Sequence, residues 1–359
     1  MTSHYDRSAA WRPENLAKNK SWVFNIGNSE SLQLAKASKK AFDPARQLFD
    51  YCKDDFDLGS GMDTIIAAAH EAKKGKGLSV VKGLPRKDLT YQEFQLMIWG
   101  IGLYLGVARP QGKASHYISK VCATGMDYRS ASGRGYNSNA GLDFHCDGAD
   151  LVALACYNKA KNGGKSLVSS SISTWETLLK ERPDLAEVAQ QNFYFSRNEE
   201  EAPDEAPWYS QPLFDFADGR LFGKWNRNRV RTGQNLKGVP RLNPAQHKCV
   251  DLLDEILRRP DVMFTMWLEP GDLQFINNHI LLHSRTTFED YNEPKKKRLL
   301  FRLWIAPPDS VWLPKSWADY FHSIAPGTVR GGIRGHNHNQ ICKAFERRQA
   351  KSMNMPEPQ

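Results

Sequence analysis

The segment Gly141-Leu142-Asp143-Phe144-His145-Cys146-Asp147-Gly148 leads into the apolar run Leu151-Val152-Ala153-Leu154. An apolar run of this kind, bounded by glycine and polar residues, is typical of a buried β-strand. Alternate strand residues share a face, so we expect His145 and Asp147 to project together and Cys146 to point away. An imidazole and a carboxylate on one face supply two ligands for a metal ion.

A third ligand is expected on a distant strand that faces the first, and the segment from Pro270 to Thr286 offers two histidines. We predict His283, because it follows an apolar run, whereas His279 lies beside two asparagines, as in a turn or at a rim. Two histidines and one carboxylate leave coordination positions open, the pattern of non-haem Fe(II) oxygenases. A histidine and an aspartate that only make ordinary hydrogen bonds at a strand end are the alternative.

Short β-like segments separated by Gly, Asn, Asp and Pro dominate the chain after Gly106, which predicts a mainly β barrel or jelly roll with flanking helices. A capping box at Thr90-Tyr91-Gln92-Glu93 opens one expected helix. The other expected helices are 63–74, 174–180 and 244–258, and the expected strands are 78–81, 151–157, 166–169, 263–268, 273–276 and 299–305.

Two arginines lie at even spacing on the apolar segment Arg298-Leu299-Leu300-Phe301-Arg302, so we expect them on the same face of a strand. A buried arginine needs an anionic partner, and its planar fork suits the far carboxylate of a dicarboxylic co-substrate. Ser166, after Gly163-Gly164, is placed to add a hydroxyl donor. A pair of surface arginines on an edge strand is the alternative.

The polar stretch Tyr136-Asn137-Ser138-Asn139 just before the metal motif suggests a substrate-binding rim, and a simple turn is an equally good interpretation. Trp225, Asn226 and Arg229 are further candidates for the same pocket, or else surface residues. The acidic, Pro-containing segment 198–207 is predicted to be a mobile loop of the kind that covers enzyme sites.

Taken together, His145-x-Asp147, Gly163-Gly164-x-Ser166, Gly271-Asp272, Asn278-x-x-x-Leu282-His283-x-Arg285 and Arg298-x-x-x-Arg302 resemble the taurine-dioxygenase (TauD/TfdA), clavaminate-synthase-like family of Fe(II)/2-oxoglutarate-dependent dioxygenases. The resemblance spans roughly residues 60 to 306. It implies a double-stranded β-helix (jelly roll, cupin-like) fold, with His145, Asp147 and His283 as Fe(II) ligands.

The same resemblance implies that Arg298, with Ser166 in place of the usual Thr, binds 2-oxoglutarate and that Arg302 faces the substrate. The gap from His283 to Arg298 is longer than in some members, so an exchange of roles between the arginines is the alternative. The expected reaction uses O2 and 2-oxoglutarate to oxidise a C–H bond. Because halogenases of this type lack the carboxylate ligand, Asp147 favours hydroxylation, with desaturation or ring closure as alternatives.

The composition favours an ordinary folded enzyme over other classes of protein. No apolar run is long enough to cross a bilayer, and the polar start has no signal-peptide core, so we expect no membrane association and a cytoplasmic location. Six scattered cysteines without a Cys-x-x-Cys pair argue against a disulfide framework. The net charge of +9 comes from dispersed basic residues, so we expect no nucleic-acid partner.

The expected organisation is an N-terminal extension over residues 1–60 that is packed on the rest or partly ordered, one catalytic domain over 61–345 with a helical insert around 170–260, and a polar C-terminal tail over 346–359. The expected substrate is a small molecule that carries a carboxylate or resembles an amino acid. Two rival functions are an oxygenase that modifies a macromolecule and a non-catalytic barrel that binds a metal or small ligand. The sequence does not specify an oligomeric state.

Overall fold

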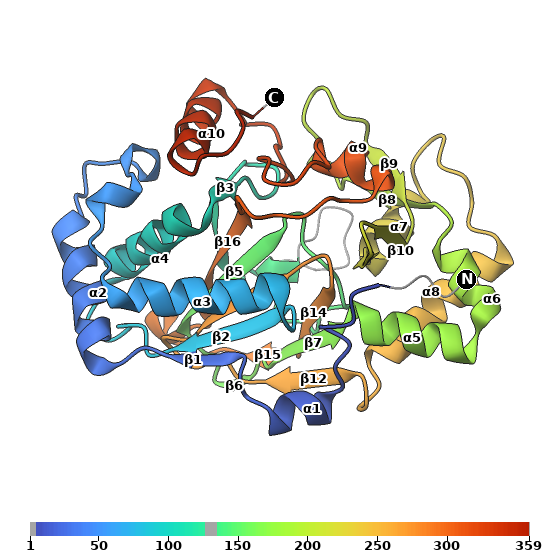
Figure 1. Cartoon of the computed structure of the whole chain (residues 1–359), viewed down its shortest axis with the longest axis horizontal. Coiled ribbons are helices and arrows are strands. Elements are labelled where there is room, and N and C mark those ends of the chain that lie inside the picture. Colours follow the sequence, from blue (N-terminus) through green and yellow to red (C-terminus); the bar gives the residue numbers. More distant parts are fainter. Residues whose placement is uncertain (1–4, 126–134, 359) are drawn as a thin grey trace.

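The structure, a computed structural model, describes residues 5–125 and 135–358. Its centre is a seven-stranded sheet with the order β1-β2-β13-β5-β16-β3, in which β4 also pairs with β16 (Figure 1). The β1–β2 pair is parallel and the other pairs are antiparallel. The strands are β1 (Val23–Asn25), β2 (Leu78–Lys82), β3 (Val107–Arg109), β4 (Ile118–Val121), β5 (Leu151–Asn158), β13 (Leu273–Asn277) and β16 (Leu299–Ala306).

A second, three-stranded sheet has the order β12-β7-β14, with antiparallel pairing throughout. Its strands are β7 (Ser166–Ser170), β12 (Met263–Met266) and β14 (Leu281–Arg285). Three short antiparallel pairs complete the β-structure: β6 (Asn162–Gly163) with β15 (Phe288–Glu289), β8 (Phe193–Ser196) with β9 (Trp208–Gln211), and β10 (Phe214–Ala217) with β11 (Arg220–Gly223).

Helices gather in two groups (Figure 1): α2, α3 and α4 lie together over the large sheet, and α5, α6 and α8 lie at the other end. None of the helices in the described ranges is long and apolar enough to span a membrane. The α-helices are α1 (Pro13–Lys18), α2 (Asn28–Ala41), α3 (Ser60–Lys74), α4 (Tyr91–Leu105), α5 (Ser171–Glu181), α6 (Pro183–Ala189), α7 (Arg227–Gly233), α8 (Pro244–Leu257), α9 (Ala318–Phe321) and α10 (Gln340–Ser352), and the 3-10 helices are η1 (Leu48–Asp50), η2 (Lys53–Asp55), η3 (Gly135–Asn137), η4 (Pro294–Lys296) and η5 (Lys315–Trp317).

The helices and strands that were predicted best have a clear signal in their own sequence. The capping box at α4 forms as expected: Glu93 N–H donates to Thr90 Oγ1, and Thr90 N–H donates to the Glu93 carboxylate at 2.8 Å. Helices and strands each make up a large part of the described chain, so the fold is mixed rather than mainly β. The N-terminal segment is integrated through β1, which extends the large sheet, and through Trp11 and Trp22 in the core.

The C-terminal segment, predicted to be a loose polar tail, instead forms most of α10. Its polar residues are buried on one side: Gln349 donates to the carbonyls of Leu103 and Gly106. Phe345 stacks on Phe49 with ring centroids 4.7 Å apart. The prediction failed because polar composition suggested exposure, whereas partners distant in sequence satisfy these side chains.

Glu346 on α10 forms the polar centre of this contact. Its Oε1 lies 2.7 Å from Arg109 Nη1 and accepts a hydrogen bond from Tyr117 Oη at 2.5 Å. Burial alone would raise the pKa of Glu346, but Arg109 and His338 outweigh it and hold that pKa at about 2, below the ordinary 4.5.

Replacing Glu346 by Gln should therefore destabilise the fold by about 3 kcal/mol at pH 7, because one pKa unit corresponds to about 1.4 kcal/mol. The stabilisation is complete above the unfolded-state pKa and is lost as the pH falls through the folded-state pKa. Urea unfolding at several pH values should show a constant deficit for Glu346→Gln above about pH 5 that shrinks towards pH 2. A deficit that persists unchanged at pH 2 would contradict this account.

Candidate metal centre and co-substrate pocket

The two halves of the metal site are joined by backbone hydrogen bonds between His145 and His283. His145 N–H donates to the His283 carbonyl at 3.0 Å, and His283 N–H donates to the His145 carbonyl at 2.8 Å. His283 lies on β14, as expected of the third ligand. The prediction that His145 and Asp147 share a strand is wrong, because His145 forms only isolated bridges, to His283 and to Asn226, and β5 begins at Leu151.

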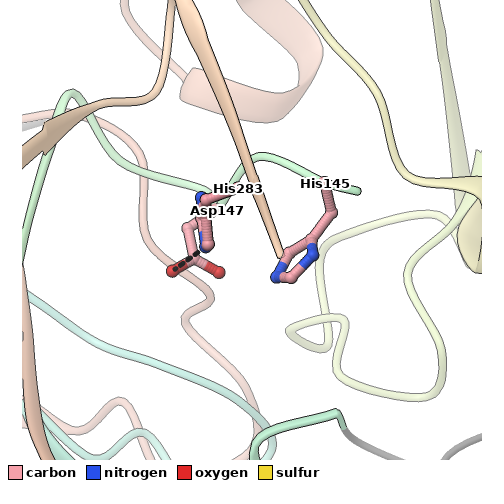
Figure 2. A group of neighbouring side chains, drawn as sticks. All are labelled: His145, Asp147 and His283. Carbon is pink, nitrogen blue, oxygen red and sulfur yellow. Dashed lines mark ion pairs between the residues drawn. The ribbon is translucent and has the colours of Figure 1, made fainter. Parts of the chain in front are cut away.

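The structure nevertheless brings the three predicted side chains together. The nearest ligand atoms of His145, Asp147 and His283 all lie within 4.8 Å of one another. His283 Nε2 is 3.8 Å from Asp147 Oδ2, and Figure 2 shows the His145 ring opposite this pair across a gap. Cys146 points away, with its thiol donating to the Trp225 carbonyl at 3.7 Å. Two nitrogen ligands and one carboxylate suit a divalent transition metal with open positions, of the kind that non-haem iron occupies.

The protonation states of these side chains also fit a metal. Burial lowers the pKa of His145 and lowers that of His283 to about 3, so both imidazoles are neutral and have a lone pair available. His145 Nδ1 lies 2.9 Å from the Asp143 carbonyl. A donor at Nδ1 directs the Nε2 lone pair towards the metal position.

Asp147 is held by groups that sequence reasoning assigned elsewhere or missed. Arg302 Nη1 lies 3.1 Å from Asp147 Oδ2, and Trp304 Nε1 donates to the same oxygen at 3.0 Å. Asn278 accepts from Asp147 N–H at 3.1 Å. Burial alone would raise the pKa of Asp147, but the charge of Arg302 and the hydrogen bond from Trp304 oppose it, so the pKa is lowered and the carboxylate stays ionised.

Arg298 provides an unneutralised positive charge in the same cavity as the metal ligands. This central cavity is lined by Arg298, Ser166 and Gln274 as well as by His145, Asp147 and His283. Arg298 is buried, and its Nη1 makes no hydrogen bond within residues 5–125 and 135–358. Burial lowers its pKa to about 10, so it remains a cation at neutral pH. A buried cation of this kind fits an anionic ligand.

The glycine pair before Ser166 lets Arg298 pack against the backbone. Gly164 has a φ of +78°, and a Cβ there would lie 3.2 Å from Arg298 Nε. Ser166 Oγ lies 3.3 Å from the Gln274 side chain, which the sequence did not single out. The only sequence feature that marks Gln274 is its amide side chain on an otherwise apolar strand. Ser166 and Gln274 thus place two polar groups in the cavity that Arg298 lines.

The residues predicted to form a substrate-binding rim do not line the central cavity as the structure describes it. Asn137 and Asn139 are absent from the described lining of the central cavity, and the Tyr136 side chain lies outside what the structure describes. Asn139 is exposed and borders a separate surface hollow. Local sequence could not reveal this, because the path of the segment depends on contacts such as that from Phe288 N–H to the Asn139 carbonyl.

The opposite wall comes from α7 and the loop predicted to be mobile. Arg229 Nη2 pairs with Glu200 Oε2 at 2.8 Å, and both side chains line the cavity together with Asn198 and Asn226. Trp225 is instead buried, with its indole N–H on Asp254. The 198–207 loop is also tied down through Glu205, which contacts Arg197, His322 and Arg334.

His279, the rejected ligand candidate, is buried and not at a rim. Its Nε2 lies 2.8 Å from Asp150 Oδ1, and Arg330 binds the same carboxylate at 2.6 Å. The turn position was correctly predicted, but its exposure was not. His279 therefore stabilises the segment that follows the metal-binding loop.

His283→Ala should abolish Fe(II) binding, because it removes one of three ligands, whereas His279→Ala should retain it. Isothermal titration of the purified variants with Fe(II) under nitrogen measures both affinities. His279→Ala should instead lose about 1–3 kcal/mol of stability, since Asp150 loses a buried partner. Loss of Fe(II) binding in His279→Ala with retention in His283→Ala would refute this ligand set.

Comparison with known proteins identifies the family. Residues 42–304 match the taurine catabolism dioxygenase TauD, TfdA family. The chain is 27% identical over 313 residues to FR-33289 synthase of Streptomyces rubellomurinus, covering 86% of this chain and 92% of that one. It is 26% identical over 269 residues to the taurine hydroxylase-like protein SAT17 of Stachybotrys chartarum, covering 71% and 66%.

Solved structures with the same fold include an asparagine oxygenase complexed with Fe(II), hydroxyasparagine and succinate, at a TM-score of 0.60 and 15% identity over 79% of this chain and 93% of that one. Another is the non-haem iron oxygenase OrfP with Fe, succinate and hydroxy-L-Arg, at a TM-score of 0.58 and 14% identity over 79% and 94%. The chain belongs to the TauD/TfdA family of Fe(II)/2-oxoglutarate-dependent dioxygenases.

Proposed function

We propose that this enzyme couples the oxidative decarboxylation of 2-oxoglutarate to hydroxylation of a small carboxylate-bearing, amino-acid-like substrate. The observation that carries the proposal is the presence, in one cavity, of the His145/Asp147/His283 cluster and the unneutralised Arg298. The arrangement supplies a metal site and a cation for a dicarboxylate beside it. We also propose that the sheets form a double-stranded β-helix, within a single catalytic domain over residues 61–345.

The roles follow from the positions of the side chains. When bound, Fe(II) and 2-oxoglutarate supply O2 activation for oxidation of a C–H bond. His145, Asp147 and His283 hold the metal. Arg298 binds the distal carboxylate of 2-oxoglutarate, with Ser166 as a hydroxyl donor, because a guanidinium can hold a carboxylate with two parallel hydrogen bonds.

Arg302 and Trp304 orient Asp147, which keeps the carboxylate ligand in place. Both donate to Asp147 Oδ2, so the ligand is fixed by two side chains on one strand, β16. An occupied carboxylate position favours hydroxylation over halogenation. Arg302 also lines the central cavity, and we assign it the second role of facing the substrate.

The charge of the central cavity supports an anionic substrate. Its described lining contains four arginines (Arg229, Arg285, Arg298 and Arg302) but only two carboxylates (Asp147 and Glu200). The charges of Fe(II) and of the 2-oxoglutarate dianion cancel, which leaves a positive excess. The Glu200–Arg229 pair offers an acceptor for an amino group beside a cation, and the structural neighbours are complexed with hydroxylated asparagine and arginine.

Two rival functions have less support. An oxygenase for macromolecules needs an open groove, whereas the ligand set here lies among buried side chains, including Asp147 and His283. A non-catalytic binding barrel has no need to combine the complete ligand set with an unneutralised Arg298. We therefore favour the small-molecule oxygenase.

With Fe(II), ascorbate and a panel of amino acids and small carboxylic acids, at least one substrate should stimulate succinate formation in stoichiometric ratio to a product heavier by one oxygen atom. Mass spectrometry measures the oxidised product, and carbon dioxide release from 1-labelled 2-oxoglutarate measures the decarboxylation that yields succinate. Turnover absent across the whole panel, with Fe(II) bound, would favour the binding barrel.

Arg298→Gln should raise the KM for 2-oxoglutarate by about 10- to 100-fold, because it removes a charge-assisted bidentate contact of roughly 1.5–3 kcal/mol. Fe(II) affinity should stay unchanged, since Arg298 forms no hydrogen bond or ion pair with the three metal ligands within the described residues. Ser166→Thr is the matched conservative control and should keep the KM within about threefold. An unchanged KM in Arg298→Gln, with a raised KM in Arg302→Gln, would show that the roles of the two arginines are exchanged.

A further inference from the structure

A second hollow, separate from the central cavity, is also lined by Arg298. We call it the outer pocket. Its described lining has five basic residues and no carboxylate: Arg86, Lys120, Lys295, Lys297 and Arg298. The three lysines are exposed and Arg298 is buried, so the hollow presents charge of one sign to solvent, which attracts anions.

None of the five basic residues forms an ion pair with a carboxylate within the described residues. The ammonium groups of Lys120, Lys295 and Lys297 form no ion pair within the described ranges of the chain. Other lysines nearby in sequence do pair: Lys159 with Glu269, Lys161 with Glu289 and Lys296 with Glu293. Asp290, which precedes the lysine run, accepts from Arg298 N–H at 2.7 Å. Asp290 therefore offsets part of the positive charge, and the described lining of the pocket keeps an excess of basic residues.

Rigid elements hold the pocket in shape. Asn158, at the end of β5, donates to the carbonyls of Lys295 at 2.9 Å and Lys297 at 3.2 Å, which fixes the backbone of the lysine run. Arg86 donates to the Tyr157 carbonyl at 2.6 Å and to Asn158 Oδ1 at 3.0 Å.

Aromatic rings hold two of the cations. The Arg86 guanidinium lies 3.3 Å from the Tyr157 ring centroid, and Lys120 Nζ lies 5.2 Å from that of Tyr91. Cation–π contacts of this kind orient a charge without neutralising it. The two rings thus position positive charge in the pocket.

We propose that the outer pocket is a binding site for a small multivalent oxyanion, a phosphate ester or a polycarboxylate. Several cations line the pocket on segments whose backbone is held by hydrogen bonds, and a compact anion is the ligand that their charge favours. Phosphate and carboxylate groups share this chemistry. The site is distinct from the metal centre and needs neither Fe(II) nor 2-oxoglutarate.

Arg298 borders both cavities, which links the outer pocket to catalysis. An anion in the outer pocket lowers the positive potential at Arg298, so it weakens the hold on a second anion in the central cavity. By linkage, 2-oxoglutarate weakens the outer anion by the same factor. This coupling rests on the proposed function, whereas anion binding itself does not.

Binding is tested by isothermal titration of metal-free protein with glycerol 2-phosphate and with tricarballylate at constant ionic strength. The variant Lys120→Ala/Lys295→Ala/Lys297→Ala should bind the preferred anion at least tenfold more weakly than the natural chain. The control Lys36→Ala/Lys39→Ala/Lys40→Ala removes the same charge from exposed positions on α2 and should bind within about twofold. Surface substitutions of this kind leave folding nearly unchanged.

Three outcomes overturn the proposal: neither anion binds, both triple variants weaken binding equally, or the outer-pocket variant keeps full affinity. The coupling is tested by titrating 2-oxoglutarate into Fe(II) protein under nitrogen, with and without glycerol 2-phosphate. The Kd for 2-oxoglutarate should rise about fivefold in the natural chain and stay unchanged in the outer-pocket variant. Anion binding without this rise would refute the coupling alone.

Discussion

The pair of backbone hydrogen bonds between His145 and His283 is the contact on which the metal site depends. The two histidines belong to segments far apart in the chain, and no covalent link or shared strand joins them. The reciprocal bonds fix the relative height of the two imidazoles, and Asp147 then needs only a short loop to reach them. Antiparallel pairing of β14 with β7 carries the same constraint into the second sheet.

Around this contact, buried carboxylates are stabilised by neighbouring side chains, because water does not reach them. Asp147 is kept ionised by Arg302, and Asp150 is kept ionised by Arg330 and His279, so two carboxylates close in sequence have separate sets of partners. Arg298 differs from Arg302 and Arg330, since no described carboxylate forms an ion pair with it. The distinction separates charges that maintain the structure from a charge that is available to a ligand. It also explains why both proposed anion sites meet at Arg298.

Sequence reasoning succeeded where the signal was local or where residue chemistry allowed few solutions. The capping box of α4 and the buried strand β5 are examples of local signals. The choice of His283 over His279 rested on the apolar run before it, which correctly indicated a buried strand. It failed for α10, where Glu346 and Gln349 are buried by partners elsewhere in the chain, and for Asn139, whose direction depends on neighbours that no local pattern encodes.

The sequence by itself indicated which residues are candidates for the chemistry: two imidazoles, a carboxylate and two arginines in a recognisable order. That is so because donor type and side-chain charge are properties of single residues. Only the tertiary structure decided their partners, since pairing requires proximity between distant segments. It placed Arg302 and Trp304 on Asp147, left the Arg298 guanidinium without an ion pair to a described carboxylate, and put the lysine run beside β4 and β5. Whether a cation pairs with a carboxylate of the protein or can bind an anionic ligand depends on its distance from the nearest carboxylate.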